Sequence, residues 1–204
     1  MKLTKILNII DDVIVLSKSM LSEESIEKPI QQTLIDLASL LQNSIPWALC
    51  GGIAVGVRAK PRGTEDIDIL LKSDSEIDSI VSLTKSLFKH SRLHALTHKK
   101  YGVEVDLVTP EFVKVKDSIV LKVLETSDIF NLTNTKIPTV SAAGLIALKL
   151  GRASAQDIAD IESIIKKHDN IDLTEYDLSP EQIKILLSIR TSVLNKQSVE
   201  PTLF

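Results

Sequence analysis

Two short segments that alternate acidic and aliphatic residues constrain the fold of this 204-residue chain more than any other feature. They are residues 66–71 (DIDILL) and 103–108 (VEVDLV). Both are typical of β-strands, in which side chains two positions apart lie on the same face of the sheet. Asp66 and Asp68 are therefore expected side by side, while Ile67 and Ile69 face the core. Asp106 joins the two acids on that face if the strands are neighbours.

A pair of glycines precedes the first of these strands. Gly51 and Gly52 follow the short apolar run Trp47 to Cys50 and come before a segment of helical character, which predicts a strand, a tight turn and a helix. Glycine allows the backbone to approach a phosphate closely, and the start of a helix offers N–H groups to an anion. An ordinary tight turn explains the same dipeptide equally well.

Helical periodicity dominates both ends of the chain. Residues 3–14 and 30–41 predict two amphipathic N-terminal helices, and 141–150, 154–167 and 179–194 predict a helical C-terminal third. Between the acidic strands, 75–88 predicts a helix and 92–98 a weak edge strand, whereas 119–139 predicts one or two short strands ending at Pro138. The fold class expected is α+β, a small mixed sheet flanked by helices, with N-terminal helices (1–44), a core (45–139) and a C-terminal helical segment (140–204).

Composition excludes several classes of protein. A net charge of −3 and 3% aromatic residues argue against a surface that coats duplex nucleic acid or stacks single-stranded bases. The single cysteine, Cys50, excludes an internal disulfide and is expected to be a buried small hydrophobe. No run reaches the roughly 18 apolar residues of a membrane span, and no signal peptide is recognisable, so we expect a cytoplasmic protein with no membrane contact.

Three convergent carboxylates have a specific chemical use. Asp66, Asp68 and Asp106 would repel one another unless a divalent cation offset their charge, and oxygen ligands of this kind suit Mg²⁺ or Mn²⁺ together with the phosphates of a substrate. Such ions activate an attacking oxygen and stabilise a leaving one, which is the chemistry of phosphoryl and nucleotidyl transfer. The alternative is that each acid belongs to the solvated face of a half-buried strand.

The residues around these acids resemble a known family. Residues 47–71, WALCGGIAVGVRAKPRGTEDIDILL, combine the glycine pair, a spacer and the acid-x-acid strand in the manner of the nucleotidyltransferase superfamily with a DNA-polymerase-beta-like fold. The R-x-T-x-D-I-D form and residues 137–165 are similar, more narrowly, to the small bacterial and archaeal nucleotidyltransferases that include the abortive-infection toxins. The resemblance covers about half of the chain.

The resemblance implies roles for particular residues. Asp66 and Asp68 would bind Mg²⁺ or Mn²⁺ with the help of Asp106. The remaining residues would contact the nucleotide: Gly51 and Gly52 at its phosphates, Arg62 and Thr64 at the R-x-T positions, and Lys149 and Asp157 in a second motif. An NTP would then donate its nucleoside monophosphate to an acceptor hydroxyl of RNA (including tRNA), protein or a small molecule. In a toxin-antitoxin pair the chain would also have a partner protein.

Several alternatives stay open at this stage. The alternative role of Lys149 is structural, with its aliphatic stem along the edge of the core. The alternative role of Asp157 is to form a capping box with Ser154 at the start of a helix. A basic run over 85–100 is explained by a solvated edge as well as by an acceptor surface, and His94 and His98 on one strand would be too far apart to share a metal. A catalytically silent nucleotide-binding or interaction module is the rival function. Within the enzyme class, a drug-modifying adenylyltransferase is a further alternative.

Overall fold

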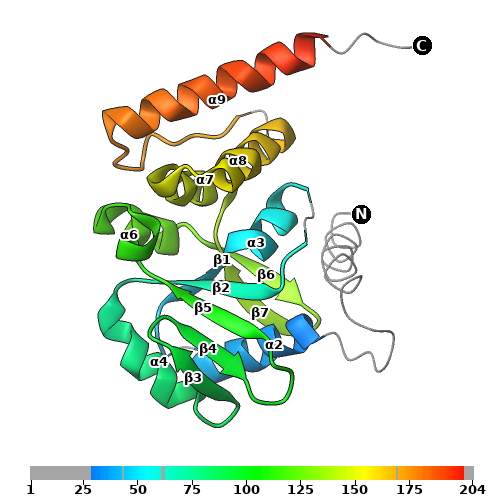
Figure 1. The fold of residues 1–204 in the computed structure, drawn as a ribbon, viewed down its shortest axis with the longest axis vertical. Coiled ribbons are helices and arrows are strands. Elements are labelled where there is room, and N and C mark those ends of the chain that lie inside the picture. Colours follow the sequence, from blue (N-terminus) through cyan, green and yellow to red (C-terminus); the bar gives the residue numbers. More distant parts are fainter. Residues whose placement is uncertain (1–28, 43, 61–62, 169, 200–204) are drawn as a thin grey trace, which may run out of the picture.

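The computed structural model describes residues 29–42, 44–60, 63–168 and 170–199. This part of the chain is built on a seven-stranded mixed sheet with the strand order β3-β4-β5-β2-β1-β7-β6 (Figure 1). The strands are β1 (Trp47–Cys50), β2 (Asp66–Leu71), β3 (Phe88–Arg92), β4 (Ala95–His98), β5 (Glu104–Val108), β6 (Asp128–Leu132) and β7 (Thr135–Thr139). The α+β class expected from the sequence is confirmed. The predicted helix over 3–14 lies outside the described residues.

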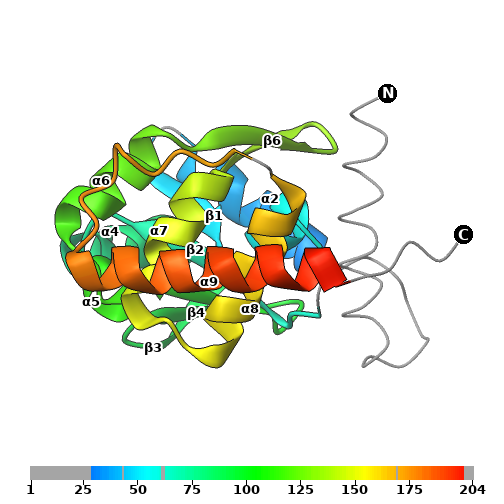
Figure 2. The ribbon, with the colours of Figure 1, turned by 90° about the horizontal axis from the view of Figure 1, so that it is seen from above.

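Helices flank the sheet on both sides (Figure 1). They are α2 (Pro29–Leu41), α3 (Gly51–Arg58), the 3-10 helix η1 (Asp74–Glu76), α4 (Ile77–Thr84), α5 (Pro110–Val113), α6 (Asp117–Glu125), α7 (Ala142–Arg152), α8 (Ala155–Lys167) and α9 (Pro180–Val199). Helices α2 and α4 lie on one side of the sheet, with α3 and α7 on the other. Helix α9 runs across α7 and α8 as an outer layer (Figure 2).

The centre of the sheet follows from the alternation in the sequence. Strand β2 pairs in parallel with β5 and antiparallel with β1, so it is enclosed on both edges. Ile67 and Ile69 are fully buried, whereas the side chains of Asp66 and Asp68 alternate to the other face. Burial of the aliphatic residues fixes the register, because a shift by one residue would bring the acids into the core.

Side-chain caps define the starts of the C-terminal helices. The Ser141 hydroxyl accepts from Gly144 N at 3.1 Å at the start of α7. At the start of α9, Ser179 Oγ accepts from Gln182 N and the Gln182 side chain accepts from Ser179 N. These caps satisfy N–H groups that have no partner within the helix.

The prediction of strands throughout residues 119–139 is wrong in its first part. Residues 117–125 form α6, and the strands begin only at Asp128. The β-branched residues Ile119, Val120 and Val123 suggest a strand, but their spacing places them on one buried side of a helix. The helix predicted over 75–88 is also shorter than expected, because it ends at Thr84 and the chain turns into β3.

The predicted edge strand over 92–98 is instead the turn and second strand of a hairpin. Strand β3 is the edge, and β4 lies between β3 and β5. His94 lies in the turn between β3 and β4, and its Nε2 is 3.7 Å from Asp74 Oδ2. His98 is buried on β4, and its Nε2 lies 3.1 Å from Asp36 Oδ2. The two histidines therefore contact different carboxylates. The separation predicted for them on a single strand does not apply.

Candidate functional site

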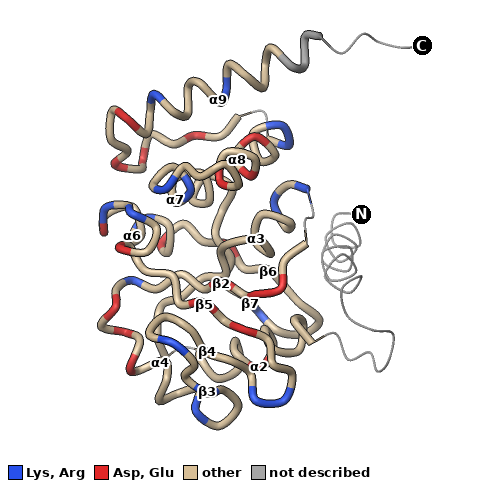
Figure 3. Tube along the Cα trace, viewed as in Figure 1, with Lys and Arg blue, Asp and Glu red and all other residues tan. Residues whose placement is uncertain are grey.

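The acidic residues of β2 and β5 form two rows across the sheet. Asp68 is the register partner of Asp106, and Asp66 is the partner of Glu104. Directly paired residues on neighbouring strands share a face, so the four carboxylates lie on the side of the sheet that carries α3 and α7. Figure 3 shows these acidic stretches on the two adjacent strands. The juxtaposition of Asp68 and Asp106 predicted from the sequence is present.

Asp68 occupies the most buried position of the carboxylate group. Burial, followed by the negative charges of Asp66 and Asp106, raises its pKa from the ordinary value of 3.8 to about 6. A backbone hydrogen bond from Gly52 and the charge of Lys149 oppose this shift but do not cancel it. The pKa of Asp106 is also raised, by burial and by Asp66. The site therefore has an excess of negative charge that a cation would relieve.

The glycine turn fits tightly against Asp68. Gly51 has a φ of +61°, and a Cβ built on it would lie 1.6 Å from Asp68 Oδ2. A side chain at this position would thus displace the carboxylate as well as strain the backbone. The absence of a side chain at Gly51 is required by the close approach of the protein's own carboxylate, which the sequence-based interpretation of a phosphate cradle did not include.

Thr64 supports the other acid of β2. Its buried hydroxyl donates to Asp66 Oδ1 at 2.7 Å and so orients that carboxylate. Thr64 therefore contacts a carboxylate of the site, whereas the resemblance gave it a contact with the nucleotide. Arg62, the other predicted residue of the R-x-T pattern, lies outside the described residues.

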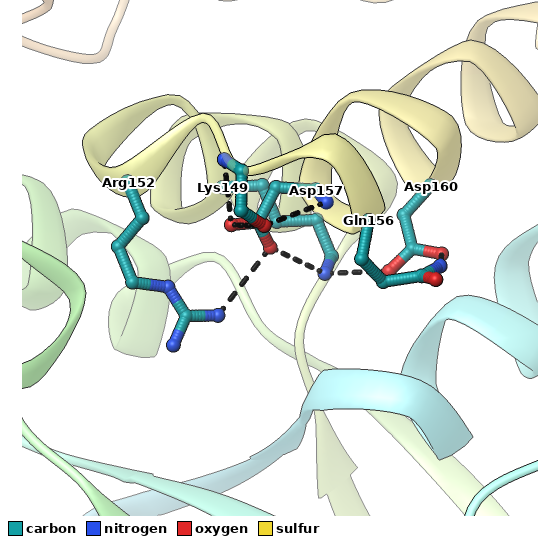
Figure 4. A network of polar contacts seen from close by, with 6 residues as sticks. Lys149, Arg152, Gln156, Asp157 and Asp160 are labelled. Atoms are coloured by element: carbon teal, nitrogen blue, oxygen red, sulfur yellow. Dashed lines mark hydrogen bonds and ion pairs between the residues drawn. The ribbon is translucent and has the colours of Figure 1, made fainter.

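Lys149 and Asp157 belong to one buried ion network, drawn in Figure 4. Lys149 Nζ lies 3.2 Å from Asp157 Oδ1 and 2.7 Å from Asp160 Oδ2. Burial tends to raise the pKa of Asp157, but hydrogen bonds from Ser154 and the charges of Lys149 and Arg152 outweigh it and hold the pKa below its ordinary value. The capping box of Asp157 with Ser154 is complete. Both residues therefore have structural partners.

Arg152 belongs to this network and lines the cavity between it and Asp68. Its guanidinium lies 3.4 Å from Asp157 Oδ1 and 5.4 Å from the centre of the Phe112 ring, and its side chain is 40% exposed. A small cavity of about 40 Å³ separates the network from Asp68, and its lining includes Cys50, Gly51, Asp68, Phe112, Lys149 and Arg152. The Arg152 side chain reaches solvent more readily than that of Lys149, which is 10% exposed. Arg152 was not assigned to the site from the sequence.

Arg92 is a second cation at the carboxylates, and it comes from the edge strand β3. Its Nη2 donates to Glu104 Oε1 and lies 3.4 Å from Asp106 Oδ1. The sequence placed Arg92 in a basic run with Lys85, Lys89 and Lys99. Only the strand order shows that it faces the acids of β5, because residues 92 and 106 are brought together by tertiary pairing.

Comparison with known proteins identifies the fold. A crystal structure of an antigenic nucleotidyltransferase-like protein from Paracoccidioides brasiliensis superposes with a TM-score of 0.61 at 20% identity, covering 84% of this chain and 92% of that one. The chain has the nucleotidyltransferase fold. A solution structure of the antibiotic-resistance factor ANT(2'')-Ia also matches, with a TM-score of 0.46 at 11% identity, over 82% of this chain and 95% of that one. No protein-family model and no curated protein sequence matches.

The carboxylates of β2 and β5 are the residues that could hold a hard divalent cation. Asp66, Asp68 and Asp106 offer only oxygen ligands, and burial, followed by the charges of Asp66 and Asp106, raises the pKa of Asp68. Within the described residues, however, no three His, Cys, Asp or Glu side chains converge closely enough to hold one metal ion as they stand. Asp66 and Asp68 lie on one face of β2, whereas Asp106 has Arg92 as a competing partner.

Two larger cavities of this chain lie away from the carboxylates of β2 and β5. One of about 440 Å³ lies between α8 and α9, and another of the same volume lies between α2 and the β6–β7 hairpin. Neither is lined by a carboxylate of β2 or β5, so volume alone does not locate the chemistry. Among the described helices, none is both long and apolar enough to cross a membrane.

Proposed function

We propose that the protein transfers a nucleoside monophosphate from an NTP to an acceptor hydroxyl and releases pyrophosphate. The observation that carries this proposal is the register pairing of Asp68 with Asp106 beside Asp66, at a glycine turn and within reach of Arg152. A nucleotidyltransferase fold alone is compatible with many functions, so the argument depends on this grouping.

The chain's own residues divide into a phosphate side and an acceptor side. Arg152, exposed over Phe112, supplies positive charge to a triphosphate, while Lys149 holds the buried acids in place. The start of α3 lies next to Asp68, where the Gly52 N–H already donates to that carboxylate and the helix end adds positive potential. The nucleotide would therefore extend from the glycine turn toward the end of α7.

The reaction forms one bond at the α-phosphorus and breaks another bond of the same atom. The acceptor oxygen attacks the α-phosphorus, the bond from that phosphorus to the oxygen bridging to the β-phosphate breaks, and pyrophosphate leaves with that oxygen. Asp106 accepts the hydroxyl proton as the oxygen attacks. In-line displacement requires the acceptor to enter opposite the leaving group.

The proposed cofactor is Mg²⁺ or Mn²⁺. Asp66 and Asp68 would hold it, with Thr64 keeping the Asp66 carboxylate oriented and Asp106 joining as a further ligand. When bound, the ion would stabilise negative charge on the phosphate oxygens.

A transfer assay tests the proposal. Purified protein is incubated with Mg²⁺ or Mn²⁺, each α-labelled NTP, and three acceptor pools: total RNA, the protein itself and small hydroxylated molecules including aminoglycosides. We expect label to be transferred into one pool, and the labelled pool then identifies the acceptor class. The Asp66→Asn, Asp68→Asn double variant should lose transfer, whereas Asp78→Asn, the same chemical change on α4, should retain it.

Two results would contradict the proposal. Full transfer by the double variant would show that the β2 carboxylates are not the metal ligands. Nucleotide binding that is independent of divalent cations, with no pyrophosphate released from any pool, would favour the silent binding module instead.

A further inference from the structure

A row of paired residues crosses four strands of the sheet at the carboxylates. Arg92 on β3 is the register partner of Ala95, Ala95 is the partner of Asp106, and Asp106 is the partner of Asp68. Paired residues share a face, so all four side chains point to the same side. Ala95 is the member between Arg92 and Asp106, and its single methyl group leaves the guanidinium space to cross β4. The Arg92 guanidinium is therefore directed at Asp106.

An irregularity in β3 selects Arg92 for this position. Lys89 pairs with Thr97 and His90 with Leu96, but the register then shifts, so that Arg92 rather than Ser91 faces Ala95. Bulges of this kind redirect a side chain, and they are over-represented at sheet edges and next to active sites. A regular strand would have placed a serine in the row and turned the arginine to the opposite face.

The two contacts of Arg92 are unequal. Its Nη2 is in close contact with Glu104 Oε1, whereas Asp106 Oδ1 is at 3.4 Å, the edge of hydrogen-bond distance. The Arg92 side chain is 64% exposed, so its guanidinium can move away from Asp106 without breaking a packed core. Glu104 lies two residues from Asp106 on the same face and would keep the guanidinium after such a movement.

We propose that Arg92 is a positioning residue that competes with a divalent cation for Asp106, and that Glu104 holds the guanidinium once Asp106 is released. The inference rests on the proposed function, because it assumes that Asp66 and Asp68 bind the cation. It explains why three acids on paired strands do not yet converge. In the free protein the third acid has an internal counter-ion. The binding of a cation exchanges that counter-ion for the metal.

Binding of Mn²⁺ without nucleotide tests this role, measured as free Mn²⁺ by electron paramagnetic resonance. We expect Arg92→Ala to bind Mn²⁺ about fivefold more tightly, the scale of one exposed ion pair. Arg92→Gln, which keeps part of the side-chain stem, should act in the same direction. Glu104→Gln should bind about threefold more weakly, since the guanidinium is left with Asp106 alone. Circular dichroism checks that each variant is folded.

The double variant Arg92→Ala, Glu104→Gln separates this role from a long-range effect of charge. If Glu104 acts only through Arg92, the double variant should bind Mn²⁺ as Arg92→Ala does. If both residues act only through the long-range effect of their charges, the tighter binding of Arg92→Ala and the weaker binding of Glu104→Gln should add. The Mn²⁺ affinity of the double variant would then be close to that of the wild type. Lys89→Ala removes a charge from the same face of β3 and should leave the affinity unchanged.

The outcomes distinguish this inference from the proposed function. Unchanged or weaker Mn²⁺ binding by Arg92→Ala, or additivity in the double variant, would overturn the role of Arg92. Asp68→Asn should abolish Mn²⁺ binding in either case if the metal site is correct. If Asp68→Asn binds as the wild type does, the metal site itself is wrong and the inference fails with it.

Discussion

Gly51 is the residue on which the position of Asp68 depends most directly. We expect Gly51→Ala to lower the free energy of unfolding by about 3 kcal/mol, because the added Cβ meets the Asp68 carboxylate and the backbone has a positive φ. Transfer activity should be lost as well. Urea denaturation measures the stability, with Gly63→Ala as control, since a Cβ there meets no atom within 4 Å. Equal effects of the two substitutions would show that the close approach is unimportant.

Asp68 should make stability depend on pH in the absence of metal. Its pKa is raised in the folded state, so the folded protein takes up a proton between about pH 4 and pH 6 that the unfolded chain does not. Stability from this group is therefore present at low pH and is lost as the pH rises through about 6. The difference between pKa values of 3.8 and about 6 corresponds to about 3 kcal/mol as an upper limit.

Substitution of Asp68 by asparagine isolates this contribution. We expect Asp68→Asn to be more stable than the wild type at pH 7.5 and to lose that advantage near pH 4. Urea denaturation at both pH values, with a chelator present, measures the difference. A stability gap that is the same at the two pH values would mean that the carboxylate is not destabilised by its surroundings.

At the scale of elements, the contact between α7 and α8 depends on the Lys149 network. Lys149→Met should reduce the free energy of unfolding by about 3 kcal/mol, because it leaves the buried carboxylates of Asp157 and Asp160 without their shared cation. A lysine that served only to bind nucleotide could be replaced without this loss. Thermal and urea denaturation of the free protein decide between the two roles.

Arg152 provides the matched comparison. Its side chain is 40% exposed, so Arg152→Ala should cost about 1 kcal/mol or less of stability. Its effect should appear in nucleotide binding, as a weaker affinity for NTP in a fluorescence or calorimetric titration. If Arg152→Ala destabilised the protein as strongly as Lys149→Met and bound NTP normally, the assignment of the two cations would be reversed.

At the scale of the whole molecule, a divalent cation should stabilise the fold by relieving repulsion at the centre of the sheet. A ligand at 100 times its Kd adds about 2.7 kcal/mol to the free energy of unfolding. For a chain of this size that corresponds to a rise in Tm of about 5–10 °C. Calorimetry with Mn²⁺ should show the rise for the wild type and for Asp78→Asn. The Asp66→Asn, Asp68→Asn variant should show no rise.

The local pattern of the chain predicted much of what surrounds the site. Alternation placed Asp66 and Asp68 on one face of β2, the glycine pair predicted the turn into α3, and Ser154 and Ser179 predicted the starts of α8 and α9. These features depend on residues a few positions apart, for which spacing in the sequence is spacing in the structure. The helix over 117–125 was missed because three β-branched residues satisfy a strand pattern as well as a helical one.

The sequence by itself determined which carboxylates of β2 lie together, since strand periodicity alone brings Asp66 and Asp68 to one face and turns the aliphatic residues inward. Only the tertiary structure decided what those carboxylates meet. The strand order brings Arg92 across Ala95 to Asp106, and the packing of α7 on α8 commits Lys149 to two buried acids. Such pairings join residues far apart in the chain or depend on how two helices pack. Their geometry is set by the register and burial of whole elements, which no local spacing records.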